Sequence, residues 1–185
     1  MVSKVYSGTV IGIDAWTIEI EVDISQSGGV PGRDGMVSIV GLPDAAVKES
    51  RDRIFPAFAS SGFVPPRGFA VVNLAPAGLR KEGAAFDLGI ALGLLASAGN
   101  IDSSRLAGFA ALGELALDGS IRPVRGALPL ADCLAKEKNL CGLLVPEANA
   151  REAALAAGDR LPVYPVSNLI ETAFSLFHHH RIGNQ

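Results

Sequence analysis

The sequence predicts one mixed α/β (α+β) domain, in which helices flank a sheet that combines antiparallel and parallel strands. Three observations carry this prediction. Residues 17–24 alternate polar side chains with isoleucine or valine, a period of two that is typical of a half-buried antiparallel strand. Residues 70–74 form a mainly apolar run, which is typical of a strand covered on both faces. From there to the C-terminus, strand patterns alternate with helix patterns, which favours a mixed sheet.

Composition limits the class of protein. The chain has 185 residues, of which 49% are hydrophobic and 19% are charged, so it can bury the core of a folded domain. The formal net charge of −3 and the pI of about 5.6 exclude a uniformly basic nucleic-acid-binding chain, and any contact with DNA requires a local patch. We expect a single domain over residues 1–177, followed at 178–185 by a tail or the start of a linker.

Cysteine usage and the chain start favour a cytoplasmic protein. Cys133 and Cys141 are too few for a disulfide framework or a zinc site, and we expect both to be reduced and structural. The N-terminus begins directly with a strand pattern instead of a signal peptide, and no apolar stretch is long enough to span a bilayer. We therefore expect no membrane partner.

The N-terminal half is expected to supply three strands and one helix. The first two strands form a hairpin that turns near Asp14 and Ala15, because both flanking segments are rich in β-branched residues. Glycine and serine predict a loop at 25–35, and residues 41–44 introduce an amphipathic helix that Pro56 would kink or shorten. The expected elements are strands at 4–15, 16–25 and 36–40, a helix at 45–60 and a turn at 61–68.

The C-terminal half is expected to alternate strands and helices. Asp118 and Gly119 mark a hairpin turn. Pro146 begins a helix that Gly158 ends, in keeping with the positions that proline and glycine favour at helix termini. The expected strands cover 70–74, 109–117, 120–124, 140–145 and 161–164, the expected helices cover 84–98, 125–138, 146–157 and 166–177, and 100–105 is a polar connection.

Residues 69–98 are the stretch around which the chain is organised. They predict a strand, a charged glycine-rich loop at 78–83 and a helix that is apolar all round and therefore buried. Helix N-termini attract anions, so this loop is a place where chemistry can occur. The chain contains no Gly-x-x-x-x-Gly-Lys-Ser/Thr motif, which excludes ATP binding by a Walker motif in these residues. A general anion site and a solvated loop that sets packing or an interface both stay open.

Asp87 is the unusual residue of the central helix, because a buried carboxylate must be paired or hydrogen-bonded. We expect it to cap the helix start or to pair with Arg80 or Lys81. The first positions of the helix, 84–86, hold two alanines and a phenylalanine, so no nucleophile stands there.

A second group of charges lies in the hairpin at 113–126. Its two short strands carry Arg122 and Arg125 out of the sheet. Guanidinium groups in such positions bind phosphates or carboxylates, or are simply solvated. Both interpretations stay open for this hairpin.

Three consecutive histidines, His178, His179 and His180, stand near the C-terminus. They are either a native helix end or an addition to the native chain. We expect no metal site there, because adjacent side chains on a helix point in different directions and do not converge on one ion.

Four blocks of the chain together resemble one family. Residues 72–88 have the sequence Val-Asn-Leu-Ala-Pro-Ala-Gly-Leu-Arg-Lys-Glu-Gly-Ala-Ala-Phe-Asp-Leu, and residues 113–126 have the sequence Gly-Glu-Leu-Ala-Leu-Asp-Gly-Ser-Ile-Arg-Pro-Val-Arg-Gly. The opening (7–12 with 40–44) and the block at 146–153 add two more. In this order, and over nearly the whole chain, they resemble the N-terminal, ChlI-type domain of the YifB/ComM family of magnesium-chelatase-like AAA+ ATPases.

The resemblance implies a fold and an inactive site. The family's N-terminal domain is similar to the proteolytic domain of Lon protease and to the ribosomal S5 domain-2-like superfamily. Lon uses a Ser-Lys dyad, whose serine falls at Ala85 here, or at Ala84 with a one-residue slip, and whose lysine falls at Leu128. Because these positions are apolar, the resemblance implies that the fold is kept and peptidase activity is absent.

The resemblance also implies a larger protein. Family members continue into an AAA+ module that binds ATP and Mg²⁺ and assembles a hexameric ring, and ComM proteins are implicated in DNA branch migration. We expect this chain to be one domain of such an ATPase, with no catalytic residue, cofactor or metal of its own. Its partners would be its own AAA+ module, further copies of itself and DNA. The candidate DNA or interface contacts are Arg80, Lys81, Arg122 and Arg125.

Two other classes of function are alternatives. One is a protein-interaction module that docks a partner protein in place of DNA. The other is a residual enzyme, either a peptidase of the Lon type or a small-molecule kinase on the same superfamily fold. The apolar dyad positions argue against the peptidase, and the lack of a glycine-serine phosphate loop argues against the kinase.

Overall fold

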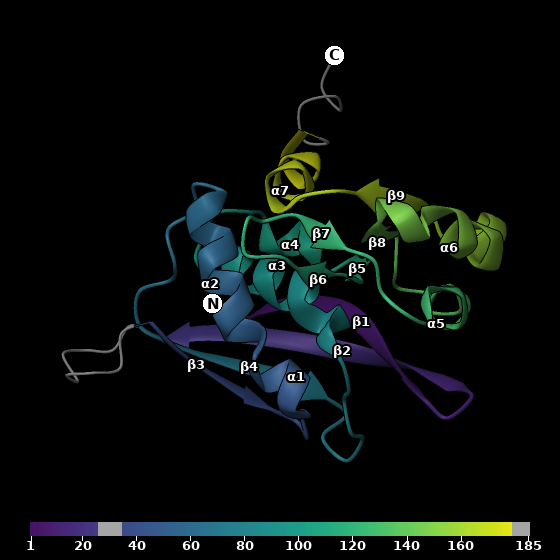
Figure 1. The fold of residues 1–185 in the computed structure, drawn as a ribbon, viewed down its shortest axis with the longest axis horizontal. Coiled ribbons are helices and arrows are strands. Elements are labelled where there is room, and N and C mark those ends of the chain that lie inside the picture. The colour runs from purple at the N-terminus through teal and green to yellow at the C-terminus, as the bar shows by residue number, and fades with distance from the viewer. Residues whose placement is uncertain (26–34, 179–185) are drawn as a thin grey trace.

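The computed structural model describes residues 1–25 and 35–178 and confirms the predicted mixed sheet with flanking helices (Figure 1). Seven strands form the main sheet in the order β3-β4-β2-β1-β5-β8-β9, and β6 and β7 form a separate two-stranded ribbon. The strands are β1 Ser3–Ile11, β2 Asp14–Ser25, β3 Met36–Val40, β4 Phe69–Ala75, β5 Phe109–Ala111, β6 Glu114–Leu115, β7 Ile121–Arg122, β8 Gly142–Pro146 and β9 Val163–Val166.

The β1–β2 hairpin lies in the middle of the sheet. The two strands pair antiparallel from Ser3↔Val22 to Ile11↔Asp14, as their alternating pattern predicts. The turn lies at Gly12 and the residue after it, two residues earlier than predicted, and the φ of 63° at Gly12 suits a residue without a Cβ atom. The strands therefore keep the predicted alternation of buried and exposed positions, although the turn was misplaced and the pairing is shifted with it.

The main sheet consists of two halves that meet between β1 and β5. In the first half, β4 pairs antiparallel with β2 and parallel with β3. In the second half, β5, β8 and β9 are parallel. The halves are matched at one residue pair only, Tyr6↔Ala110, and we call this junction the seam.

Helices cover the two faces of the sheet unequally. The larger apolar cluster joins α2, α3 and α4 to the face of β1 and β2 that carries Val5, Ile20 and Val22. The smaller cluster joins α5 and α6 to the opposite face. The helices are α1 Ala45–Lys48, α2 Ser50–Ser60, α3 Asp87–Ser97, α4 Ser103–Leu106, α5 Ala127–Leu134, α6 Ala150–Ala157 and α7 Leu169–His178, with short 3-10 turns η1 Ala84–Phe86, η2 Glu147–Asn149 and η3 Gly158–Arg160.

The predicted central helix is confirmed as α3, which η1 precedes without a gap. Residues 87–96 are all buried, so the helix is covered on every side. Gly89 and Gly93 face the hairpin, where an added Cβ would lie 2.7 Å from Ile20 and 2.6 Å from Val22. These glycines therefore allow α3 to pack directly on β2.

Several predicted boundaries were wrong. The helix expected at 45–60 is divided at Glu49 into α1 and α2, and Pro56 lies inside α2 without ending it. The strand expected at 109–117 ends after Ala111, because the backbone N–H of Gly113 bonds the carbonyl oxygen of Ala85 and not a neighbouring strand. The polar connection at 100–105 contains most of α4, and the helix expected at 125–138 is limited to Ala127–Leu134.

The two cysteines occupy different environments. Cys133 is half-buried on α5, where its thiol lies 3.3 Å from the carbonyl oxygen of Ala15. Cys141 was expected in a core strand, but it is exposed and precedes β8. Its thiol contacts the carbonyl oxygen of Gly108 at 3.1 Å. Across the residues that the structure describes, no helix has the length and apolar character needed to cross a membrane.

Gly41, which follows β3, provides a test of how closely the chain packs there against the backbone of β4. Its φ is 102°, and an added Cβ would collide with the carbonyl oxygen of Leu74. We expect Gly41→Ala to lower the free energy of unfolding by about 3 kcal/mol or more, because backbone strain and overpacking add. Urea denaturation measures this loss.

Gly78→Ala is the matched control, because an added Cβ at Gly78 meets no atom within 4 Å and its φ is not positive. It should change the free energy of unfolding by no more than about 0.5 kcal/mol. Equal stability of the two variants would contradict the tight contact at Gly41.

Candidate functional site

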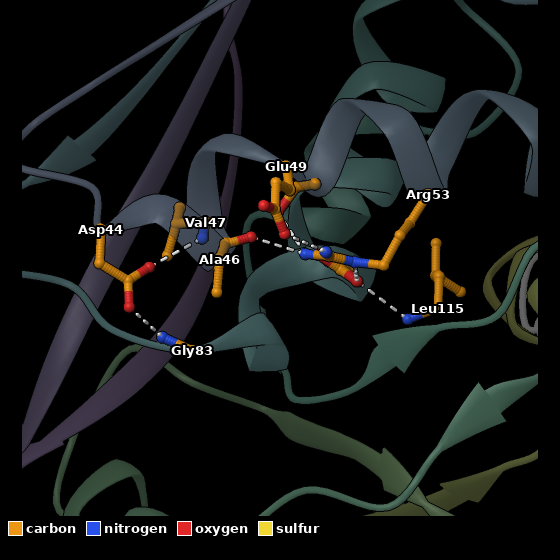
Figure 2. Close-up of polar contacts among 9 residues, drawn as sticks. Asp44, Ala46, Val47, Glu49, Arg53, Gly83 and Leu115 are labelled. Carbon is orange, nitrogen blue, oxygen red and sulfur yellow. Dashed lines mark hydrogen bonds and ion pairs between the residues drawn. The ribbon is translucent and has the colours of Figure 1, made fainter.

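The start of α3 is fixed by the buried carboxylate of Asp87 (Figure 2). Arg53 of α2 donates to it from Nε at 2.6 Å and from Nη2 at 2.9 Å. The backbone N–H of Leu115 in β6 donates to the same carboxylate at 3.1 Å. The expected pairing with Arg80 or Lys81 was therefore wrong. The partner is a residue of the preceding helix, which the sequence places 34 positions away.

The guanidinium of Arg53 joins further elements to this point. Its Nη2 also donates to the carbonyl oxygen of Ala46 at 2.7 Å, and its Nη1 lies 3.6 Å from Glu49. The hydrogen bonds with Asp87 raise the pKa of Arg53, which stays charged. The pair thus connects α1, α2, α3 and β6 around one buried charge (Figure 2).

The loop before η1 is held by Asp44, which caps α1. One carboxylate oxygen accepts from the backbone N–H of Val47 at 2.8 Å, and the other accepts from the backbone N–H of Gly83 at 3.0 Å (Figure 2). The backbone of Asp44 donates to Lys81, and the backbone of Lys81 donates to Leu42. Residues 41–44 therefore set the path of the charged loop.

Lys81 does not lie on the surface. Its side chain is fully buried, and its ammonium group donates to the carbonyl oxygens of Gly41, at 2.6 Å, and of Pro76. In the described parts of the chain no carboxylate pairs with it. Burial lowers the pKa of Lys81. This position corrects the expectation that Lys81 contacts DNA or a neighbouring subunit, because its ammonium group is buried and bonds carbonyl oxygens inside the domain.

The three candidate arginines are exposed. Arg80 forms an ion pair with Glu82 at 3.2 Å on the charged loop. Arg122 lies on β7 opposite Glu114 of β6. Arg125 makes no ion pair or hydrogen bond with any residue that the structure describes. Their guanidinium groups are thus accessible, but two carboxylates lie among them.

A cavity of about 370 Å³ opens beside the start of η1. Three segments line it: residues 8–10 of β1, residues 82–85 of the loop and η1, and residues 123–125 before α5, with Glu114 and Leu130 completing the wall. Ala85, at the predicted serine position, contributes to this wall. Leu128 does not, and its side chain is 46% exposed on α5. The lining of the cavity therefore includes Ala85 and Arg125, but not Leu128.

Two residues of this region were not predicted from the sequence. Thr9 is 3% exposed, lines the cavity, and has a hydroxyl without a hydrogen-bond partner among the described residues. Asn149 is buried and fixes the third wall, because its amide accepts from the N–H of Val124 at 2.8 Å and donates to its carbonyl oxygen at 3.0 Å. The sequence offered little to identify them. Thr9 is one hydroxyl on the buried face of a predicted strand, and Asn149 is one asparagine inside the block at 146–153.

Metal ligands do not gather in this region. Within residues 1–25 and 35–178, no group of three or more histidine, cysteine, aspartate or glutamate side chains is arranged to hold a metal ion. Of the three consecutive histidines, His178 ends α7, and His179 and His180 lie outside the described residues.

Comparison with known proteins identifies relatives that cover most of the chain. Residues 20–149 match the profile of the family described as subunit ChlI of Mg-chelatase. Competence protein ComM of Haemophilus influenzae is 42% identical over 153 residues, and an uncharacterized protein of Mycobacterium tuberculosis is 41% identical over 155 residues. The uncharacterized protein YifB of Escherichia coli is 38% identical over 157 residues.

These matches are unequal in coverage. They include 83%, 84% and 85% of this chain, but only 28%, 29% and 29% of the three relatives. The chain therefore spans less than a third of the length of the curated relatives that it matches.

The Arg53–Asp87 pair provides the first test of this region. We expect Asp87→Asn to lower the free energy of unfolding by about 3 kcal/mol, because the variant leaves a largely buried guanidinium with only the exposed carboxylate of Glu49 as a counter-charge. Urea denaturation measures the loss. Asp159→Asn, at an exposed aspartate, is the control and should stay within about 0.5 kcal/mol of the wild type. Equal stability of the two variants would mean that the pair does not hold α3.

Lys81 provides the second test, through pH. Between its lowered pKa and the ordinary value of 10.5, the unfolded chain binds more protons than the folded chain, so stability rises with pH across this alkaline window. Lys81→Met removes this contribution. The free-energy difference between wild type and variant should therefore shift in favour of the wild type as pH rises, by at most about 1.4 kcal/mol per pH unit.

Urea titrations across the alkaline range measure this slope. Lys138→Met replaces an exposed lysine and should give a difference from wild type that does not change with pH. A flat difference for Lys81→Met as well would show that the buried ammonium keeps its ordinary pKa.

Proposed function

The chain belongs to the ChlI family of magnesium-chelatase subunits, with relatives named ComM and YifB, and on that premise we propose that it is a non-catalytic N-terminal domain of a magnesium-chelatase-like AAA+ ATPase. In this proposal the domain is an oligomerisation or DNA-contacting platform for an ATP-driven motor that remodels branched DNA. ATP and Mg²⁺ belong to the AAA+ module of the full-length protein, and the motor works in the cytoplasm.

The observation that carries the non-catalytic part is the wall of the cavity at the start of η1. Ala84 and Ala85 occupy the first helical positions, and no serine, cysteine, lysine or histidine is among the described lining residues. Thr9 supplies the one hydroxyl of this lining, and among the described residues no side chain is within hydrogen-bond distance to take its proton. A weak nucleophile without an adjacent base is not activated for attack.

The DNA-contacting part rests on charge and on the relatives. Arg80, Arg122 and Arg125 are all exposed, and they lie on the charged loop, on β7 of the β6–β7 ribbon and just before α5. A ring repeats such a patch in every subunit, so an acidic monomer can still present a basic surface. The name of one relative, a competence protein, supports a role of this kind for the full-length protein.

DNA binding by the 185-residue chain tests the proposal. We expect fluorescence anisotropy to show binding to branched and single-stranded oligonucleotides that weakens as salt is raised. The triple variant R80E/R122E/R125E should bind about tenfold more weakly or worse at low salt, and its salt slope should fall by about one for each lost phosphate contact. The mass in solution, measured in parallel, reports on oligomerisation.

Arg151→Glu is the matched control, since it reverses one exposed arginine on α6, away from the charged loop. It should leave both DNA affinity and mass unchanged. If the triple variant also leaves both unchanged, the three arginines contact neither DNA nor a second copy of the chain, and the platform proposal fails at these residues.

A further inference from the structure

The lining of the cavity is made of runs of consecutive residues. Gly8, Thr9 and Val10 follow one another in β1, and the other two walls are runs as well. Successive side chains of a strand point to opposite faces, so three in a row can line one cavity only where it lies along the edge of the strand. The cavity therefore exposes main chain, and a main-chain surface suits another extended polypeptide.

The edge of β1 is unpaired where it meets this cavity. β2 pairs with all of β1 on one side, whereas β5 matches it only at Tyr6↔Ala110 on the other. Beyond the seam, the chain after β5 leaves the sheet, because the backbone N–H of Gly113 bonds the carbonyl oxygen of Ala85. Among the described residues no strand pairs with this side of β1 past the seam. Figure 1 shows the hairpin running out beyond β5. A free strand edge is a template for one more strand.

A polar group without a partner lines the same cavity. The hydroxyl of Thr9 is buried and has no hydrogen-bond partner within the part of the chain that the structure describes, although buried polar groups are nearly always satisfied. This unsatisfied hydroxyl indicates a ligand that carries hydrogen-bonding groups of its own.

The charges of the cavity select the class of ligand. Arg125 has no ionic partner among the residues that the structure describes, while Glu114 and Glu82, which is paired with Arg80, place two carboxylates in the same lining. The carboxylates repel a phosphate backbone, which disfavours nucleic acid inside the cavity. A polypeptide with side chains of both signs complements Arg125 and Glu114.

We propose that this cavity binds an extended polypeptide segment, which adds to the free edge of β1 as a strand and is not cleaved. The main chain of the segment bonds the free edge of β1, and a basic side chain of the segment lies beside Glu114. The hydroxyl of Thr9 is then a ligand-binding group. This binding mode does not depend on the DNA-contacting role of the three arginines.

Thr9→Val separates a binding role from a structural one. Valine keeps the shape of the side chain and removes only the unpaired hydroxyl, so the urea midpoint should stay the same or rise, while peptide affinity should fall at least threefold. Thr172→Val is the matched control, since its buried hydroxyl does have a partner, the carbonyl oxygen of Asn168 at 2.8 Å. It should lower the urea midpoint and leave peptide affinity unchanged.

The probe is an acetylated and amidated heptapeptide that alternates valine and threonine around a central lysine. Main-chain hydrogen bonds supply most of the affinity in strand addition, so a generic extended peptide is a fair probe. NMR titration of the 185-residue chain should give saturable shifts at the backbone amides of residues 8–10 and 83–85. Ala85→Leu, which fills the cavity without changing its charge, should weaken binding at least tenfold.

Three outcomes would overturn the proposal. The first is the absence of saturable shifts up to the solubility limit of the peptide, and the second is shifts that Ala85→Leu leaves unchanged. The third is a single-stranded oligonucleotide that shifts the same amides and displaces the peptide, because the cavity would then belong to the DNA contact. Since the DNA test relies on R80E/R122E/R125E and anisotropy, the two proposals fail independently.

Discussion

The structure depends above all on one buried carboxylate, that of Asp87. It sits at the first position of the helix that fills the core, and three N–H groups from two other elements converge on it. An unpaired charge at this depth is not tolerated, so α2, which carries Arg53, and the β6 backbone at Leu115 are placed by the need to satisfy it.

Most of the fold could be predicted, because its signals are local. The alternation in residues 17–24 sets a strand with one buried face, and the unbroken apolar helix after Asp87 must lie inside. Failures occurred where distant partners decide the outcome. The strand expected at 109–117 is broken by a hydrogen bond from Gly113 to Ala85, which no local pattern predicts, and the exposure of Cys141 depends on where β8 begins.

The site was less predictable than the fold. The alanine at position 85 could be placed from the resemblance alone, and it does line the cavity. The sequence of a charged loop, however, does not reveal which of its side chains point outward. Arg80 is exposed, whereas its neighbour Lys81 points inward and donates to two carbonyl oxygens. Thr9 was overlooked since a hydroxyl on a strand looks like a packing residue until its missing partner is known. The candidate site therefore rests on contacts between segments far apart in the sequence.

The seam at Tyr6↔Ala110 has a consequence for biosynthesis. All four strands on one side of it lie within the first 75 residues, and all three strands on the other side follow residue 108. A chain emerging from the ribosome can therefore assemble the first half-sheet before the second exists. The apolar face of that half-sheet stays uncovered until α3 has been translated, so the interval between Ala75 and Ser97 is the stage at which a nascent chain has most need of a chaperone.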